Sequence, residues 1–487
     1  AGGNVVGLKL HTPQFSRIFS AAYKQYTDVP VATLKVSNAA GVDYTNIKIS
    51  FFVKEYMDFP TTTVVARIPA NGEVEIPLLA AFNNRILGID EDTGVQSEVR
   101  AEYYLSGQPH VDTRHETMTI YGKNAIVWDK LAMVGSFTTP KDDTLAVFIR
   151  QLVNTYAPKG GAVNPRVAKA MTVYNGLSAY GIKYLVDPNT PYGKLGAAQL
   201  DTVQFPRETL RQRSGDCDDL SILLVASLAN LGIETAILDV PQHLLMMFNT
   251  GVPESRRGSI SLNDDALAII DGQVWIPLEA TLIASSFNEA WAEGARKYHL
   301  YGKQAKMKIM PLAQAWESYP PVTLPPANFA LTIPNQNTVG NKIHKEWAIL
   351  AVKALERQVR PYRIMLALDA SNSQAQMQIS VVYARNGLYD QAVKELESIR
   401  QKEPNNVAAL NNLANIYYMQ QHYQKALPMY EQASASAPNN ADIKVNIAML
   451  YYKMGDALKA KLVFDEATTI DEQIPKRYEQ LAFLLHQ

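Results

Sequence analysis

One stretch decides the fold of the middle of this chain: Arg213-Ser214-Gly215-Asp216-Cys217-Asp218-Asp219-Leu220. Its glycine and aspartates predict a turn that leads into a long apolar helix. Cys217 is the only cysteine among 487 residues, which excludes an internal disulfide and a zinc or iron–sulfur site built from cysteines. At a helix N-terminus, the helix dipole and free N–H groups lower the pKa of a thiol. Cys217 is therefore either an ordinary buried side chain or a nucleophile.

Two later segments supply the partners that a nucleophilic thiol needs. The first, Gln242-His243-Leu244-Leu245-Met246-Met247-Phe248, places a histidine on a predicted strand. The second, Trp275-Ile276-Pro277-Leu278-Glu279-Ala280-Thr281, ends the next apolar run with a carboxylate. Taken singly, a histidine on an apolar strand and an acid at a strand end are more often structural. Cysteine, histidine and acid in this order form a constellation for acyl transfer.

This order, on a helix start followed by two strands, resembles the transglutaminase-like cysteine peptidase superfamily over residues 139–310. The resemblance implies an α+β papain-like core, in which Cys217 is the nucleophile, His243 the base and Glu279 the acid that orients the imidazole. The superfamily usually has aspartate at the last position, and glutamate is one methylene longer but accepts the same ring N–H. We expect no cofactor and no metal, because the other histidines show no ligand spacing.

The three aspartates around the cysteine favour a structural role. Asp216 is expected to cap the helix, while Asp218 and Asp219 complement the helix dipole in its first turn. Carboxylates beside a thiolate oppose its ionisation unless they point away from it. Free backbone N–H groups at this helix start are the expected half of an oxyanion hole.

Charge and hydropathy exclude several classes of partner. Lys and Arg number 46, and Asp and Glu number 47, so the net charge favours neither nucleic acid nor an anionic membrane. No apolar run approaches the ~20 residues of a transmembrane span. The opening Ala1-Gly2-Gly3 without methionine fits a mature, exported bacterial protein, periplasmic or extracellular. Domains of this size manage without disulfides.

The first part of the chain, residues 1–125, predicts an all-β immunoglobulin-like sandwich. Short alternating or β-branched runs recur between turn residues, at 31–38, 47–53, 64–68, 74–78, 99–105 and 117–121. No residue in this region suggests catalysis. The region is either a spacer or a docking module, and such a sheet edge binds partners by strand addition.

The pattern then changes to helical and later to a linker. Residues 139–318 form the predicted papain-like core, with helices expected over 143–156 and 165–180 before the Cys217 helix. Prolines cluster in residues 319–341, which predicts an extended linker. Residues 342–372 are expected to be a helical lead-in.

The last region, residues 373–487, repeats with a period of 34 residues. Tyr383, Tyr417 and Tyr451 share one position of this period, and Ala392, Ala426 and Ala460 share another. These small and aromatic positions resemble the tetratricopeptide repeat. The resemblance implies three helix pairs, a capping helix from Lys476 to Gln487, and a groove for a peptide or partner protein. The repeats could instead brace the core or mediate self-association.

Together these features predict thiol-dependent acyl transfer at a peptide or glutamine amide. The reaction would be hydrolysis, as in a protease or amidase, on a protein or peptide substrate that the flanking domains select. One alternative is a protein-crosslinking transglutaminase, and the motifs do not separate hydrolysis from transamidation. A second alternative is a non-catalytic cell-surface scaffold that uses the sandwich and the repeats. The reactivity of Cys217 separates the enzyme from the scaffold.

Overall fold

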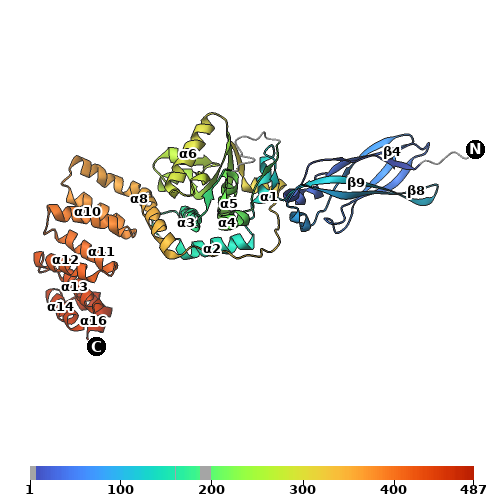
Figure 1. The fold of residues 1–487 in the computed structure, drawn as a ribbon. Coiled ribbons are helices and arrows are strands. Elements are labelled where there is room, and N and C mark those ends of the chain that lie inside the picture. The colour runs from blue at the N-terminus through green and yellow to red at the C-terminus, as the bar shows by residue number, and fades with distance from the viewer. Residues whose placement is uncertain (1–6, 159–160, 187–198, 487) are drawn as a thin grey trace, which may run out of the picture. The chain divides into compact units, whose positions relative to one another are not determined.

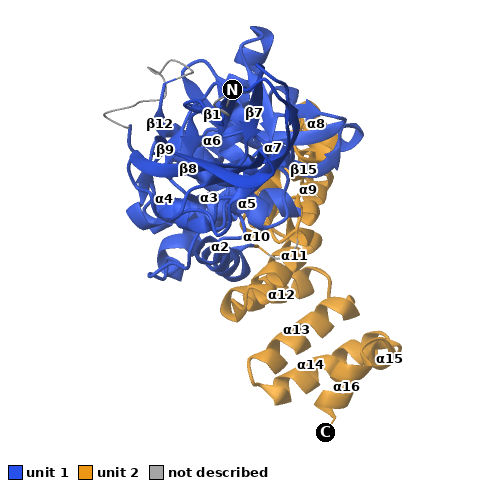
Figure 2. Cartoon of the chain, turned by 90° about the vertical axis from the view of Figure 1, so that its right-hand side faces the viewer, with its two compact units in different colours: residues 1–157, 165–256, 263–346 blue, residues 158–164, 257–262, 347–487 orange. Residues whose placement is uncertain are grey.

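A computed structural model describes residues 7–158, 161–186 and 199–486 in two compact units (Figures 1 and 2). The opening Ala1-Gly2-Gly3 and the terminal Gln487 lie outside the described residues. The first unit comprises Ala1–Ala157, Pro165–Arg256 and Asn263–Glu346, and the second comprises Pro158–Asn164, Arg257–Leu262 and Trp347–Gln487. The predicted sandwich and core therefore belong to one unit, and the repeats to the other.

The N-terminal region is β-rich, as predicted, and has two sheets. One sheet contains β1 (Leu8–Leu10), β4 (Ala32–Asn38), β2 (Gln14–Phe15) and β7 (Glu73–Leu78). The other has the order β3 (Ile18–Phe19), β9 (Gln108–Tyr121), β8 (Thr93–Leu105), β5 (Tyr44–Phe52) and β6 (Thr61–Ile68). Alternate side chains of β4 and β5 are buried, and the rings of Phe15 and Phe51 link the two sheets at 6.5 Å. The immunoglobulin-like assignment stays a prediction.

The middle region contains helices followed by an antiparallel sheet. Helices α2 (Asp143–Tyr156) and α3 (Pro165–Tyr180) have the predicted bounds. They precede α4 (Pro206–Gln212) and α5 (Cys217–Asn230). The sheet has the order β16 (Ala268–Ile270), β17 (Gln273–Leu278), β15 (His243–Pro253), β14 (Thr235–Val240) and β18 (Lys308–Pro311). Helices and sheet thus follow the expected α+β order, while the papain-like identity of this core stays a prediction.

Two helices fix the ends of the central strands. Helix α5 packs on β15, where the Ser221 hydroxyl donates a hydrogen bond to the Leu244 carbonyl at 3.4 Å. Helix α6 (Phe287–Lys303) packs on β17 so closely that a Cβ at Gly294 would lie 2.7 Å from the Leu278 backbone. Any side chain at Gly294 would push α6 off the sheet. This close packing fixes the residue that follows β17, Glu279.

The boundary after the proline-rich segment differs from the prediction. Helix α8 spans Gln336–Leu368, so it begins before residue 342 and shortens the predicted linker of residues 319–341. The Asn335 side chain accepts a hydrogen bond from the Thr338 N–H at 3.1 Å and starts this helix. The first turns of α8 contain Gly340 and polar residues, so the sequence has no apolar periodicity there.

The C-terminal region is all-helical, as predicted. Three antiparallel pairs follow each other, α9 (Ser373–Arg385) with α10 (Tyr389–Lys402), α11 (Val407–Met419) with α12 (Tyr423–Ser436), and α13 (Ala441–Lys453) with α14 (Ala457–Ile470). Ala392, Ala426 and Ala460 are fully buried where paired helices approach. The predicted capping helix is two short helices, α15 (Ile474–Arg477) and α16 (Glu479–Leu485), divided at Tyr478.

Candidate functional site

The cysteine lies where the sequence placed it, at the first residue of α5. Cys217 is 6% exposed, and its sulfur is in hydrogen-bond contact with the backbone of Leu244, the second residue of β15. Helix α5 therefore brings the thiol to the residue next to His243. No hydrogen bond between the thiol and the His243 ring is present in the described part of the chain.

The histidine and the acid form a direct pair. His243 begins β15 and Glu279 follows β17, and these strands pair with Met246 opposite Leu278. The Nε2 atom of His243 lies 2.8 Å from Oε2 and 3.0 Å from Oε1 of Glu279. A ring held through Nε2 keeps Nδ1 for another partner. The sequence prediction that these two residues meet agrees with this geometry.

The Glu279 carboxylate has more partners than the sequence indicated. It is 1% exposed and accepts hydrogen bonds from the Thr281 hydroxyl at 2.6 Å and from the Lys297 ammonium at 2.5 Å. Burial alone raises the pKa of this carboxyl, but the hydrogen bond and charge of His243, together with Lys297 and Thr281, hold the pKa at about 2. Glu279 is therefore ionised throughout the neutral range.

Two residues at this site were missed by the sequence analysis. Lys297 lies on α6, and Tyr184 ends β11 (Lys183–Tyr184), which pairs with β13 (Ser214–Gly215) just before the cysteine helix. Burial and the charges of Cys217, Asp216 and Glu279 raise the pKa of Tyr184, which places its ring beside the site. No spacing or composition signal marks either residue, because both arrive through tertiary packing.

The pKa of the Cys217 thiol is raised, which is the opposite of the direction expected for a helix N-terminus. Burial raises the pKa of Cys217, and the charges of Asp218 and Asp216 raise it further. The Leu244 backbone acts in the opposite direction but does not outweigh them. A helix N-terminus lowers a thiol pKa only where neighbouring anions do not cancel its field.

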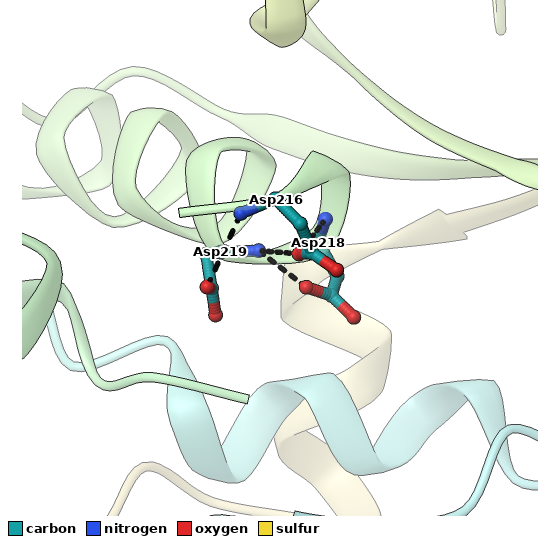
Figure 3. A group of neighbouring side chains, drawn as sticks. All are labelled: Asp216, Asp218 and Asp219. Atoms are coloured by element: carbon teal, nitrogen blue, oxygen red, sulfur yellow. Dashed lines mark hydrogen bonds between the residues drawn. The ribbon is translucent and has the colours of Figure 1, made fainter. Parts of the chain in front are cut away.

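The aspartates cap the helix, as predicted (Figure 3). An oxygen of Asp216 accepts hydrogen bonds from the N–H groups of Asp218 at 3.2 Å and Asp219 at 3.4 Å. Asp219 in return accepts from the Asp216 N–H at 3.3 Å and from the Gln204 N–H at 2.7 Å. The N–H groups of Asp218 and Asp219 are thus occupied and do not contribute to the oxyanion hole expected at this helix start. The N–H of Cys217 is the remaining candidate at this helix start.

The third aspartate is the most buried of the group. Asp218 is fully buried, and its Oδ1 accepts from the Asp219 N–H at 2.7 Å while Oδ2 has no hydrogen-bond partner in the described part of the chain. Burial and the Asp216 carboxylate raise the pKa of Asp218. Oxygens of Asp216, Asp218 and Asp219 lie within 4.8 Å of one another, and Ca²⁺ and Mg²⁺ take such donors. The prediction of no metal considered cysteines and histidines as ligands and did not include these three carboxylates.

A separate hollow lies in the repeat region. It has a volume of about 520 Å³, and its lining includes Tyr418, Met449, Tyr452, Lys453, Lys476 and Glu479. These residues belong to α11 and α13, the first helices of two successive pairs, and to the two capping helices α15 and α16. In the described residues no ion pair engages Lys453 or Lys476, whereas the neighbouring Arg477 pairs with Asp442 at 3.6 Å. The hollow therefore combines aromatic surface with two available cations.

Comparison with known protein families supports the prediction that the C-terminal region contains repeats. Models of the tetratricopeptide repeat match residues 377–441 and residues 417–482. The C-terminal region consists of tetratricopeptide repeats. The prediction from the period of 34 residues is confirmed. These matches cover less than half of the chain and assign no family to the sandwich or the core.

Several solved structures are similar to part of the chain. The crystal structure of MamA is 20% identical with a TM-score of 0.24, and the match covers 30% of this chain and 80% of MamA. MamA from Desulfovibrio magneticus RS-1 is 20% identical with a TM-score of 0.25, covering 29% and 81%. The first TPR of Spaghetti (RPAP3), bound to the HSP90 peptide SRMEEVD, is 14% identical with a TM-score of 0.23, covering 24% and 97%. Scores this low assign no function.

A search of curated proteins found no relative of this chain. Of the helices in the described residues, none has both the length and the apolar character needed to cross a membrane.

Proposed function

We propose that this protein is an interaction protein that binds a segment of a partner protein in the hollow of its repeat region. The tetratricopeptide repeats support this proposal, and the lining of the hollow carries it. Tyr418, Met449 and Tyr452 supply apolar surface, and aromatic side chains provide much of the binding energy at protein interfaces. Lys453 and Lys476 favour an acidic group on the partner, while Glu479 is the one acid near them.

Selection from a library of phage-displayed peptides tests this binding function. We expect the intact chain to enrich peptides that combine an acidic residue with an aromatic or aliphatic one. Reversing both charges, in Lys453→Glu with Lys476→Glu, should weaken the enriched peptides at least tenfold, about 1.4 kcal/mol. The matched control is Lys394→Glu with Lys461→Glu, two exposed lysines on the second helices α10 and α14.

The outcomes of the selection are distinct. Loss of binding in the first double variant and retention in the control support the hollow as the binding site. Equal affinity in both variants places binding elsewhere and contradicts the proposal. The absence of any enriched peptide, with the helical content unchanged by circular dichroism, also contradicts it.

We propose a second function for the middle region, acyl transfer by Cys217. The observation that favours it is the His243–Glu279 pair at 2.8 Å, with the thiol at the backbone of the next residue. A histidine held by a buried carboxylate through Nε2 has its ring orientation fixed, as a general base requires. Because the pKa of the thiol is raised, His243 would take the proton during attack rather than from a preformed ion pair.

In this proposal each step balances with an amide substrate and water. The Cys217 sulfur attacks the carbonyl carbon while its proton passes to His243, and a C–S bond forms. The C–N bond then breaks, and His243 returns the proton to the leaving nitrogen. The acyl group remains on Cys217 as a thioester. A water molecule or an amine then attacks the thioester carbonyl carbon while His243 takes its proton. The C–S bond breaks, His243 returns the proton to the Cys217 sulfur, and a carboxylic acid or a new amide is released.

The rate of Cys217 alkylation by iodoacetamide, followed by intact mass, tests this second function. The chain has a single thiol, so each added mass reports on that site. We expect His243→Ala to slow alkylation at pH 7 at least tenfold, because a positioned base contributes ~10²–10⁴-fold in catalysis. His115→Ala, an exposed histidine of β9, should leave the rate unchanged. Equal alkylation rates in the wild type and His243→Ala would contradict the acyl-transfer function. The non-catalytic scaffold would then be the better interpretation.

A further inference from the structure

A second hollow adjoins the first in the repeat region. It has a volume of about 610 Å³ and lies at the turn between α11 and α12 and the end of α13 (Figure 2). We call it the turn hollow, and its lining residues are Gln421, His422, Tyr423, Gln424, Lys425, Lys453 and Met454. Lys453 also lines the first hollow, together with Tyr418 and Tyr452. A bound polypeptide that passes Lys453 therefore reaches both hollows.

The described residues that line the turn hollow include cationic and neutral polar side chains but no carboxylate. Lys425 lies over the Tyr417 ring at 5.9 Å. Within the described part of the chain, neither Lys425 nor Lys453 forms an ion pair. Two ammonium groups on one hollow repel each other, and an anion between them removes that repulsion. The imidazole and the two amides of the lining add hydrogen-bond donors, so the turn hollow fits a carboxylate.

The equivalent turns of the other two repeats differ from this one in charge. The 34-residue period aligns Gln421-His422-Tyr423-Gln424 with Gly387-Leu388-Tyr389-Asp390 and with Gly455-Asp456-Ala457-Leu458. Each of the other turns thus has an aspartate, and this turn has none. Lys459, at the position of Lys425, pairs with Asp456 at 3.0 Å. The second repeat keeps the lysine but lacks the acid that neutralises it in the third.

The backbone of this turn is also held in an unfavourable conformation. Gln421 has a φ of 63°, in the left-handed region that favours glycine, and the same position is occupied by Gly387 at 75° and Gly455 at 84°. A residue with a side chain is less stable there than glycine. The Gln421 side chain lines the turn hollow. The strained residue therefore lies where a ligand would be contacted.

We propose that the turn hollow binds an aspartate or glutamate side chain of the same partner segment that occupies the first hollow. This inference rests on the proposed binding function and extends it, because it requires a second acidic group on the partner. Lys476 serves the first acidic group and Lys425 the second, and Lys453 lines both hollows. His422 and Gln421 donate hydrogen bonds to the second carboxylate.

A charge swap tests this inference in the full-length protein. Displayed peptides long enough to reach both hollows are selected on the wild type, and the enriched sequences are synthesised. We expect them to have an acidic residue at a second fixed position, and we expect His422→Glu with Lys425→Glu to bind them about tenfold more weakly, measured by calorimetry. A peptide with lysine at that second position should bind this double variant more tightly than the acidic peptide does. A variant that had lost its fold could not gain affinity in this way.

Two further variants complete the test. Lys459→Glu with Lys461→Glu changes two exposed lysines of α14 that line neither hollow, and it should bind the acidic peptide as the wild type does. Gln421→Gly keeps the backbone conformation of the other two turns and removes the side chain. It should weaken the acidic peptide about threefold, with the helical content unchanged by circular dichroism.

The failure of this inference differs from the failure of the binding function. Enriched peptides with only one acidic position, or equal affinity of the wild type and His422→Glu with Lys425→Glu, overturn the inference. In that case, loss of binding in Lys453→Glu with Lys476→Glu still supports the first hollow as the binding site. The absence of any enriched peptide rejects the binding function and this inference together.

Discussion

At the scale of single residues, the cysteine and its neighbouring aspartates have opposing requirements. The helix needs Asp216 to cap its first N–H groups, and burial together with the charges of Asp218 and Asp216 opposes a thiolate at Cys217. A thiol in such a field stays protonated at neutral pH, and in the proposed acyl transfer it would depend on a base at the moment of attack. The sequence shows that the thiol and the carboxylates are neighbours. Only their burial in the folded protein determines that the pKa of the thiol is raised.

The burial of Asp218 leads to a prediction about how the stability of the protein depends on pH. Burial and the neighbouring Asp216 carboxylate raise the pKa of Asp218 well above the ordinary value of an aspartate, so the folded state binds the proton more tightly than the unfolded state does. Stability therefore falls as the pH rises above 4 and the buried carboxyl must ionise. Asp218→Asn keeps the acceptor for the Asp219 N–H and provides a donor for Asp216. We expect the free energy of unfolding of Asp218→Asn, relative to that of the wild type, to be about 1–3 kcal/mol larger at pH 8 than at pH 5.

Thermal unfolding of the full chain in the presence of EDTA measures this difference. Each kcal/mol corresponds to a midpoint shift of about 2–4 °C for a domain of this size. Asp265→Asn, at an exposed aspartate of the same unit, is the control and should change neither midpoint. A lower midpoint for Asp218→Asn at pH 8 would show that the carboxylate is stabilising, and the account of its burial would be wrong.

The candidate site also shows which residues a sequence can reveal. Cys217, His243 and Glu279 stand in segments whose local pattern marks a helix start or a strand end. Lys297 lies in an amphipathic helix among other charged residues, and Tyr184 lies in a strand of only two residues. Both contribute through positions that the packing of α6 and β11 determines. Local patterns therefore predict the pair and miss its partners.

At the scale of elements, the repeats depend on a recurring cap. Asn372, Asn406 and Asn440 precede the first helices of the three pairs, and each side chain accepts a hydrogen bond from an N–H three residues later. The asparagines share one position of the 34-residue period. Each cap satisfies an N–H group that the helix itself leaves unpaired. The period in the sequence thus reflects helix starts as well as the packing of small and aromatic residues.

Removing one cap should weaken the repeat array by a defined amount. In Asn406→Ala the Ala409 N–H loses its acceptor at 3.0 Å, which costs about 1 kcal/mol. Urea unfolding followed by circular dichroism measures the loss. Asn406→Ser, which keeps a capping oxygen, should recover most of it, and Ala→Gly at an exposed site such as Ala457 would report helix propensity alone. Equal stability of Asn406→Ala and the wild type would contradict the role of the cap.

Element boundaries were predicted best where the apolar period is strong. Helices α2 and α3 have the predicted bounds, and the strands β4 to β9 contain the predicted runs except for Val31 before β4 and Val53 after β5. Strands β1 to β3 have only two or three residues each, too few for an alternating pattern to register. Helix α8 begins in a polar stretch with Gly340, so its first turns have no amphipathic signal. Short or polar elements are stabilised by neighbours, and a local pattern does not contain that information.

At the scale of the whole molecule, the sequence by itself determined the order of its parts: β-rich, then mixed, then helical repeats. Each of these depends on periodicity, which is a local property of side chains along the chain. Only the tertiary structure decided that Glu279 is shared between His243 and Lys297, and that Asp218 is fully buried beside the thiol. Burial and charge pairing depend on distances between segments far apart in sequence. The protonation of this site is therefore a property of the fold rather than of its motifs.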